Sequence, residues 1–414
     1  MARAWLALCG AALQLAGQDR ATGPDLAHSQ DGVFVKDGAA ALLARVRAHM
    51  LDTLARQPNY TCLETVERSN RTGKEKEFRL QDTVRLEVAL VNGKEMFAWP
   101  GSKQFEDTDL RAFVPTGMFG NGDFGLYANT VFGGRSTEFE YKGETKLGDR
   151  FTTRFDFSVP KAAGMRIRVP ELTVTVGFHG SFYAEAGTFD ALRLEVEADD
   201  LPLKLELRQV SDTMEYKRTR IGSRDFLLPL VSEAVMVDLH GDASRNVVRF
   251  SACHEFAGES TLKFGDDDDV AGTSTPAVKK ELKLPKNSEI TLQLVSEIDT
   301  DKGAVGDQVK AALVNDIKEK GQVILQKGVE FSGRIVRLEH RQDYTVLGLV
   351  FEEAESETEH VKLDLILDLA LGAGTLGPSP RRGISSPQRP HEGLVWLRPG
   401  HLRLGRGIIM FWRN

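Results

Sequence analysis

Two stretches near residue 255 begin like the sequence motifs of hydrolytic enzymes. His254-Glu255 opens like the paired-histidine helix of a zinc protease, but Gly258 stands where that helix needs its second histidine. Gly258-Glu-Ser260-Thr-Leu262 opens like the nucleophile elbow of a serine hydrolase, but Leu262 replaces the closing glycine. Both motifs therefore fail at a position that the chemistry requires, and we predict no catalytic residue from either.

Histidine and acidic residues elsewhere could in principle bind a metal ion. His179, His240 and His254 could meet in space with Glu255 or Asp238, and imidazole and carboxylate groups are the usual zinc ligands. The spacing does not show such a meeting, and histidines with purely structural roles are commoner. We therefore expect neither a metal nor a cofactor.

A glycine-rich stretch matches two nucleotide-site motifs as a string of letters. Gly120-x-Gly122-x-x-Gly125 spells the dinucleotide fingerprint, and Asp123-Phe124-Gly125 spells the magnesium motif of kinases. The fingerprint needs a strand before it and a helix after it, whereas the neighbouring patterns here indicate antiparallel hairpins. We predict instead a glycine-rich loop followed by a short helix, with the side chains of Phe124, Tyr127, Ala128 and Val131 packing inward.

Acidic clusters do not match a calcium loop. Asp299-Thr-Asp301-Lys-Gly303 begins like one, but Lys310 occupies the twelfth position, where a glutamate should bind the ion through both oxygens. The aspartates 266–269 lack the spaced pattern, and the glutamates of 352–359 indicate a solvated hairpin tip.

One stretch combines aromatic and polar groups in a way that suits ligand binding. Phe178, His179, Ser181, Phe182 and Tyr183 could together line a cleft for a sugar or a lipid. The alternative is an ordinary β-turn, and the sequence leaves both open.

The elements that would position these residues are one helix and many short strands. Ala39–Arg56 carries an apolar stripe at steps of three and four residues, Asp37 can cap its start, and Gln57-Pro58 stops it. Asn92-Gly93 between two alternating segments predicts a β-hairpin. Further strands are predicted at Thr137–Tyr141, Phe151–Val159, Leu172–Phe178, Phe189–Ala198, Leu203–Arg208, Met214–Arg220, Val235–Leu239 and Val247–Ala252. We expect a mainly β protein, in which residues 30–264 form an antiparallel meander curled around the helix that covers it.

A second domain is expected after an acidic flexible linker at residues 265–280. That linker contains four consecutive aspartates and almost no apolar residue, so it cannot enter a core. Residues 281–414 are predicted to form a small β-barrel with a mobile loop at 372–390, and segments 394–397 and 407–412 rejoin it as final strands. The other strands predicted for this barrel are Glu289–Ile298, Gln308–Val314, Gln322–Leu325, Glu330–Glu339, Tyr344–Phe351 and Val361–Leu369.

The start of the chain and its cysteines indicate export. Met1-Ala-Arg3 is positive, residues 4–16 are apolar and Ala16-Gly17 offers a cleavage site, so we predict a signal peptide at residues 1–17 rather than a buried helix. No later segment is apolar for long enough to cross a membrane, so the mature chain is expected to lack a transmembrane segment. Cys62 and Cys253 then remain in an oxidising compartment, and we predict a disulfide between them in preference to two buried thiols. A net charge of -7 argues against nucleic acid as a partner.

Four pieces of the second domain share one rhythm: residues 284–292, 304–309, 323–328 and 332–334. Together they resemble the C-terminal β-barrel of VirB10/TrbI-type conjugation proteins. The sequence departs from that pattern at Gln326, where a proline is usual, and at Asn287-Ser288, where Gly-Thr is usual. This resemblance would imply a component of a secretion or conjugation assembly.

The whole chain also resembles a class of exported two-domain proteins found in acidobacterial genomes. The matching pieces are Asn59–Cys62, Trp99–Gly101, Gly122–Gly125, Phe178–Phe182 and Gly407–Trp412. The helix-covered meander is similar to periplasmic lipoprotein carriers of the LolA kind. These resemblances imply an address in the periplasm or outer envelope and a fold, but no activity.

We therefore expect an exported envelope protein, more a binding or scaffolding module than an enzyme, whose partner is an apolar ligand, a lipoprotein or another envelope protein. Two alternatives stay open at this point. One is an envelope hydrolase that uses His179, Ser181, His254 and Glu255, and the other is the assembly component named above. The sequence does not indicate the oligomeric state.

Overall fold

The computed structural model describes residues 31–102, 104–107, 110, 113, 126–169, 172–256, 280–356, 359–377 and 388–414, with the backbone alone at 31–37, 126, 280, 281 and 359. Residues 1–44 and 45–414 form two separate compact units. The predicted signal peptide at 1–17, the glycine-rich loop at 120–125, Ser260, the aspartates 266–269 and almost all of the linker lie outside the described residues.

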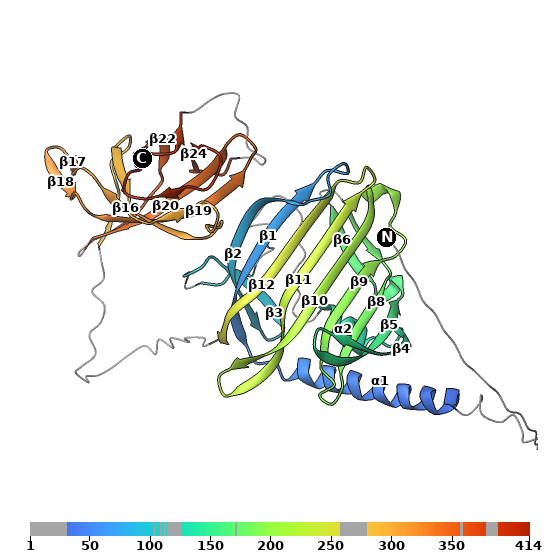
Figure 1. Ribbon diagram of the computed structural model, residues 1–414. Helices are drawn as coiled ribbons and strands as arrows, with labels where there is room; N and C mark the ends of the chain where they lie inside the picture. Colours follow the sequence, from blue (N-terminus) through green and yellow to red (C-terminus); the bar gives the residue numbers. More distant parts are fainter. Residues whose placement is uncertain are drawn as a thin grey trace, which may run out of the picture. The chain divides into compact units, whose positions relative to one another are not determined.

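The protein is mainly β, as predicted, and its first sheet is a long antiparallel meander of ten strands (Figure 1). The strands lie side by side in the order β3-β2-β1-β12-β11-β10-β9-β8-β5-β4, so nearly every strand pairs with its neighbour in the chain. Their bounds are β1 Tyr60–Arg71, β2 Arg79–Val91, β3 Lys94–Ala98, β4 Glu138–Leu147, β5 Arg150–Val159, β8 Phe178–Glu185, β9 Ala191–Ala198, β10 Leu207–Ile221, β11 Arg224–Asp238 and β12 Ala243–Glu255. A separate hairpin, β6 Met165–Val169 and β7 Leu172–Val176, lies between β5 and β8 in the chain.

The exception to this neighbour-to-neighbour order is the pairing of β1 with β12. These strands run antiparallel from Tyr60 opposite Glu255 to Arg71 opposite Ala243, and their pairing joins the hairpin β2–β3 to the rest of the sheet. Cys62 on β1 and Cys253 on β12 are linked by a disulfide across this pair, 191 residues apart in the sequence. Strand β1 was not predicted, because the polar residues Glu64 and Arg68 lie on its buried face and interrupt the apolar alternation.

Turn chemistry explains where the meander agrees with the predicted strands and where it does not. Asn92 and Gly93 both have positive φ, as the tight turn between β2 and β3 requires, so the predicted hairpin is confirmed. The strand predicted at Leu203–Arg208 is wrong, because Leu203–Leu205 form a 3-10 helix that follows Pro202. Glu206 at its end has a left-handed backbone, and β10 begins at the next residue.

Two α-helices occur among the described residues. Helix α1 spans Asp31–Ala55, so it begins earlier than predicted and Asp37 lies inside it rather than at its cap. Within the second unit, Val46 and Met50 of α1 are buried, and Arg47 donates hydrogen bonds to the carbonyl oxygens of Phe132 (2.9 Å) and Gly134 (3.1 Å).

Helix α2, Leu126–Gly133, is the short helix predicted after the glycine-rich loop. Ala128 and Val131 are fully buried, as predicted. The ring centroid of Tyr127 lies 5.8 Å from that of Phe178, and the corresponding distance from Phe132 to Phe182 is 5.1 Å. The sheet therefore curls around α2 (Figure 1), and Arg47 of α1 is hydrogen-bonded to the backbone of α2.

The second sheet, residues 280–414, closes almost into a barrel. Its strands follow the order β13-β21-β20-β19-β16-β14-β26-β22, and β24 pairs with both β20 and β23. The bounds are β13 Lys280–Leu282, β14 Glu289–Leu294, β16 Gln308–Leu313, β19 Glu330–His340, β20 Thr345–Glu355, β21 Glu359–Lys362, β22 Ile366–Leu371, β23 Thr375–Leu376, β24 Gly393–Leu397 and β26 Ile409–Arg413. Two short ribbons, β15 Ile298–Asp299 with β25 Arg403–Leu404 and β17 Ile317–Glu319 with β18 Gln322–Leu325, complete this region.

Buried charge reinforces the barrel where β19 meets the segment before β24. Arg337 is only 4% exposed, and its Nε donates to Glu392 at 2.7 Å while a second nitrogen donates to Glu339. Gly348 makes room for this arrangement, because a Cβ there would lie 2.4 Å from a carboxylate oxygen of Glu392. Both glutamates are buried and paired with Arg337, so we assign them a structural role.

A loop of the second sheet contacts strand β2 of the first. The backbone N–H of Arg85 donates to Val305 O and that of Val305 donates to Thr83 O, both at 2.8 Å. The guanidinium of Arg85 also donates to Asp307 at 2.7 Å. Val305 is 4% exposed and belongs to the same hydrophobic cluster as Val84. The two sheets are therefore joined by more than the linker.

We predict that loss of the disulfide destabilises the first sheet. The Cys62→Ala/Cys253→Ala double variant should lose about 2–5 kcal/mol of unfolding free energy, because the bond closes a very long loop in the unfolded chain. Urea unfolding followed by circular dichroism measures the loss. Thiol titration of the unreduced wild-type protein is the control, and two reactive thiols there would contradict the bond.

Candidate functional site

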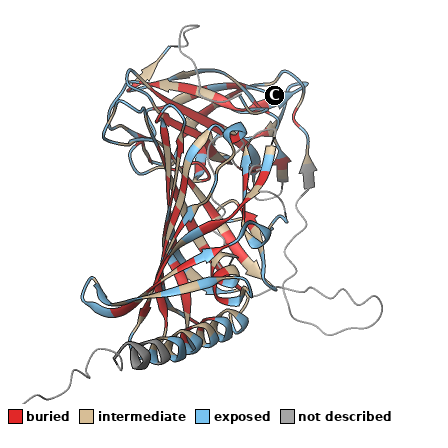
Figure 2. Cartoon of the chain, turned by 90° about the vertical axis from the view of Figure 1, so that its right-hand side faces the viewer, coloured by how far each residue is buried: buried red, intermediate tan, exposed pale blue. Residues whose placement is uncertain are grey.

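One face of the first sheet is apolar across almost its whole width. We call it the inner face, since α2 packs against it. One row of directly opposed residues crosses nine strands, and buried positions alternate with more exposed ones along much of the sheet (Figure 2). The row consists of Val84, Val66, Val248, Ser232, Met214, Leu194, Phe182, Phe155 and Tyr141. Eight of its nine members are buried and Tyr141 is half-buried, while Ser232 is the one member of this row with a small polar side chain.

The opposite, outer face carries ion pairs. Arg249 pairs with Glu67 at 2.9 Å, and Arg193 pairs with Glu195 at 2.8 Å. Because the strand period is two residues, Glu67 and Arg249 lie next to Val66 and Val248 in the chain but on the other side of the sheet. This contrast makes the inner face the part of the sheet that suits an apolar partner.

Glu64 interrupts the apolar surroundings of the inner face. It lies opposite Leu86 on β2 and Phe250 on β12, and it shares its face of β1 with Cys62 and Val66. Its side chain is 1% exposed, and its Oε1 atom has no hydrogen-bond partner. An unpaired carboxyl group in such a place costs several kcal/mol if it is ionised. Burial accordingly raises the pKa of Glu64 to about 7.

The other buried acidic side chains of the described chain all have partners. Asp82 pairs with Arg68, Asp190 with His49 and Arg218, and Asp212 accepts a hydrogen bond from Ser232 at 2.9 Å. Glu339 and Glu392 pair with Arg337, as described above. Glu64 therefore stands apart from these, and the alternation of Tyr60, Cys62, Glu64 and Val66 is the sequence signal that could have revealed it.

The five residues predicted to line one cleft divide between the two faces of β8. Phe178 and Phe182 lie on the inner face against α2. On the outer face, His179 Nδ1 lies 2.6 Å from Asp199 Oδ1, and Tyr183 donates to Glu195 at 3.3 Å. The structure therefore brings together the two phenylalanines but separates them from the polar members of the set.

Ser181, also on the outer face, is tied into a polar network. Its hydroxyl donates to Asp156 at 2.7 Å and accepts a hydrogen bond from Arg154 at 3.0 Å. Burial acts to raise the pKa of Asp156, but the hydrogen bonds from Ser181 and Arg154 outweigh it, so that pKa is lowered. An ionised Asp156 holds the serine proton without acting as a strong base, so this arrangement does not activate Ser181 as a nucleophile.

The hydrolase alternative is contradicted by the order of the strands. His179 and Ser181 lie on β8, whereas His254 and Glu255 lie on β12, and β9, β10 and β11 separate them. Four strand spacings amount to about 19 Å, far beyond hydrogen-bond reach. His254 instead lies 2.8 Å from the Thr61 hydroxyl across the β1–β12 pair.

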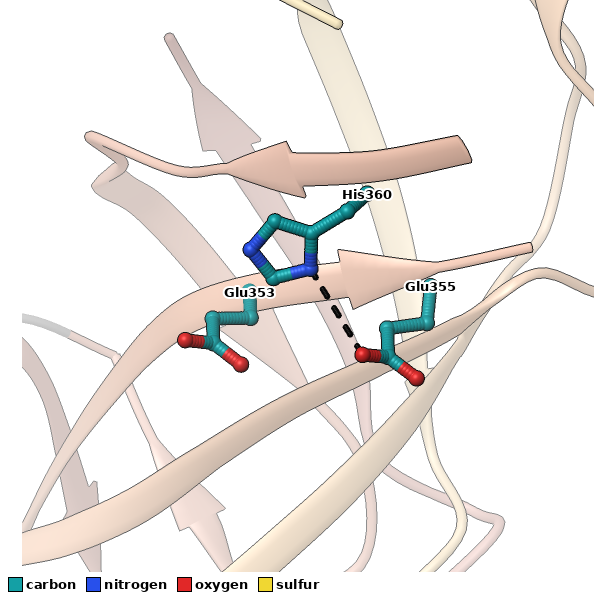
Figure 3. Close-up of side chains that lie close together, drawn as sticks. All are labelled: Glu353, Glu355 and His360. Atoms are coloured by element: carbon teal, nitrogen blue, oxygen red, sulfur yellow. Dashed lines mark ion pairs between the residues drawn. The ribbon is translucent and has the colours of Figure 1, made fainter. Parts of the chain in front are cut away.

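The histidines named as possible metal ligands do not converge either. His240 lies in the turn before β12 and His254 near the end of that strand, so about 40 Å of extended chain separates them. In the second sheet, Glu353 and Glu355 of β20 lie beside His360 of β21 (Figure 3), with their ligand atoms within 4.8 Å of one another. This set could touch a cation, but both glutamates are exposed and Lys362 lies opposite Glu353.

A cleft of about 490 Å³ lies at the loop that joins the two sheets. Three of its charged side chains are paired within the chain. Arg85 pairs with Asp307, and Asp299 accepts a hydrogen bond from His401 at 2.9 Å. The start of the stretch that was compared with a calcium loop, Asp299, is thus held within the chain, and the cleft offers no nucleophile beside a base.

Comparisons with known proteins add little to this geometry. No family model and no curated protein matches the chain, so the resemblances of the barrel and of the whole chain find no support there. A LolA-superfamily protein from Nitrosomonas europaea is similar in structure with 12% identity, a TM-score of 0.23, and coverage of 49% of this chain and 88% of its own. A DUF1329 family protein from Desulfovibrio piger shows 13% identity, a TM-score of 0.28, and coverage of 53% and 95%. These values are too low for either likeness to indicate what this chain binds.

Among the described residues, neither helix has the length and apolar character that crossing a membrane would take.

Glu64 gives a prediction about stability and pH. Its pKa is raised from 4.5 to about 7 in the folded chain, so the folded chain keeps a proton that the unfolded chain releases between these values. The contribution of Glu64 to the free energy of unfolding is therefore greatest below about pH 4.5, and it is lost as the pH rises through about 7. Glu64→Gln should stabilise the protein by about 1–3 kcal/mol at pH 8 and by much less at pH 4.5.

Urea unfolding at both pH values measures this difference. Glu67→Gln, on the outer face of the same strand, is the matched control and should show no such rise. Equal effects of the two variants would mean that Glu64 is not an unpaired buried acid.

Proposed function

We propose that this chain is an exported, non-catalytic binding protein, and that the inner face of its first sheet holds an apolar ligand such as a lipid or the acyl chain of a lipoprotein. The observation that carries this proposal is the row of inward-facing apolar side chains that crosses nine strands. Ligand sites in proteins are typically concave and mostly apolar, and the first sheet curls with this face inward (Figure 1).

The elements over this face support the proposal, because none of them is part of the sheet. Among the described residues they include α2, the end of α1, and Leu110 and Phe113, which join the hydrophobic cluster around β1 and β2. An apolar ligand can take the place of such a cover without breaking the strand ladder, since it replaces apolar contacts by similar ones.

Binding fits the described residues better than catalysis does. On the part of the chain that the structure describes, the serine and histidine of the hydrolase alternative hydrogen-bond to other groups and lie on separated strands. Export rests on the signal-like start of the sequence at residues 1–17, and the ligand class rests on the inner face.

Native mass spectrometry of the purified protein should show about one retained apolar molecule per chain, and titration with dodecanol should show saturable binding. Val248→Thr keeps the side-chain size but places a hydroxyl on the inner face, so it should weaken dodecanol binding by about 5- to 100-fold. Arg249→Thr changes the neighbouring residue on the outer face and should leave binding unchanged.

Isothermal titration calorimetry measures these affinities, and circular dichroism checks that both variants are folded. Two results would count against the proposal: no dodecanol binding by the wild-type protein, or equal losses in the inner-face and outer-face variants.

A further inference from the structure

We propose that Glu64 is the polar end of this site and that the ligand is an amphiphilic amine, whose apolar chain lies on the inner face and whose ammonium group pairs with the Glu64 carboxylate. This inference rests on the proposed function and adds the chemical class of the ligand. It follows from three properties of Glu64: its position, its lack of a partner, and its charge.

Glu64 lies within the apolar surface, on the third strand from one edge of the sheet. It lies in the middle of β1, between the rows that contain Val66 and Cys62, and its cross-strand neighbours Leu86 and Phe250 are buried and apolar. A ligand chain on the inner face therefore passes next to this carboxyl group. Because strands fix the direction of their side chains, Glu64 cannot turn toward the outer face without breaking the register of β1.

The unpaired oxygen calls for a hydrogen-bond donor. A buried carboxyl oxygen normally accepts at least one hydrogen bond, and Oε1 of Glu64 accepts none. The other buried acids of the described chain show what this protein uses in such places, namely arginine, histidine or serine from a neighbouring element. At Glu64 that donor is left for a ligand to supply.

The charge of the site favours an amine over other head groups. Arg68, four residues farther along the same face of β1, is held by Asp82 in a buried ion pair, so it offers no positive charge to an anionic ligand. An ammonium group supplies three donors and compensates the carboxylate, whereas a fatty acid would place a second negative charge beside it. A hydroxyl group supplies one donor and no charge.

A series of ligands with one chain length and three head groups tests this inference. Dodecylamine, dodecanol and dodecanoate are titrated into the full-length protein by calorimetry, below the concentrations at which they form micelles. We expect dodecylamine to bind at least about tenfold more tightly than dodecanol, and dodecanoate to bind most weakly, since a hydrogen bond to a charged group is stronger than one between neutral groups.

Variants of Glu64 then assign the preference to this residue. Glu64→Gln should weaken dodecylamine binding by about tenfold relative to the wild-type protein. It should change the affinity for dodecanol by less than about twofold. Glu64→Asp keeps the charge and should retain part of the preference, which a loss of folding would not produce. Glu67→Gln, on the outer face of β1, should change neither affinity.

The results separate this inference from the proposed function. If dodecanol binds at the inner face but all three head groups bind equally well, the inner face is a ligand site and the role of Glu64 is overturned. A preference for the amine that persists in Glu64→Gln overturns it too, because another group then binds the ammonium. If none of the three molecules binds, both the proposed function and this inference fail.

Discussion

The first sheet depends on one pairing between distant segments, that of β1 with β12. Every other contact in this sheet joins strands that follow one another in the chain or flank a single short hairpin. Without the β1–β12 ladder, the meander would separate into a three-stranded part, β1 to β3, and a seven-stranded part. Each part would then have one new open edge, at β1 and at β12. The disulfide between Cys62 and Cys253 lies on this same pair and ties it covalently. The unbroken apolar row exists only because these two strands meet.

The two faces of that sheet illustrate how strand periodicity divides chemistry. Ion pairs such as Glu67 with Arg249 lie on one side, and Val66 and Val248, one residue away on each strand, lie on the other. Glu64 belongs by its position to the apolar side and by its chemistry to the charged side. Natural proteins tend to break local rules where function requires it. A single carboxyl group on the apolar face therefore indicates function more strongly than the many exposed charges of the chain do.

Much of the fold could be predicted from local sequence patterns. The hairpin at Asn92-Gly93, helix α2, the antiparallel meander and the near-barrel of the second sheet all follow from turn residues and alternation. Strand β1 could not be found this way, since polar residues such as Glu64 and Arg68 interrupt the apolar alternation on its buried face. Its place is fixed by partners on β2 and β12, which are non-local.

The candidate site was harder to predict, for a related reason. The sequence drew attention to His179, Ser181, His254 and Glu255 because their types suit catalysis, but strand order keeps the two pairs apart. Glu64 was not singled out, because its place on one face with Tyr60, Cys62 and Val66 has a meaning only once β1 is recognised as a strand. Burial is a property of the assembled sheet, and so is the lack of a hydrogen-bond partner for its oxygen.

The seam of the second sheet has a consequence for its dynamics. Strand β22 pairs with β26 on one side, but among the described residues its other edge faces β24 through side chains, around a cavity of about 220 Å³, and not through a ladder. Opening the barrel there breaks few hydrogen bonds, whereas separating β19 from β20 breaks a long ladder. The amide protons along this edge of β22 should therefore exchange with solvent sooner than those of β14 or β19, because local opening of the barrel begins at this seam.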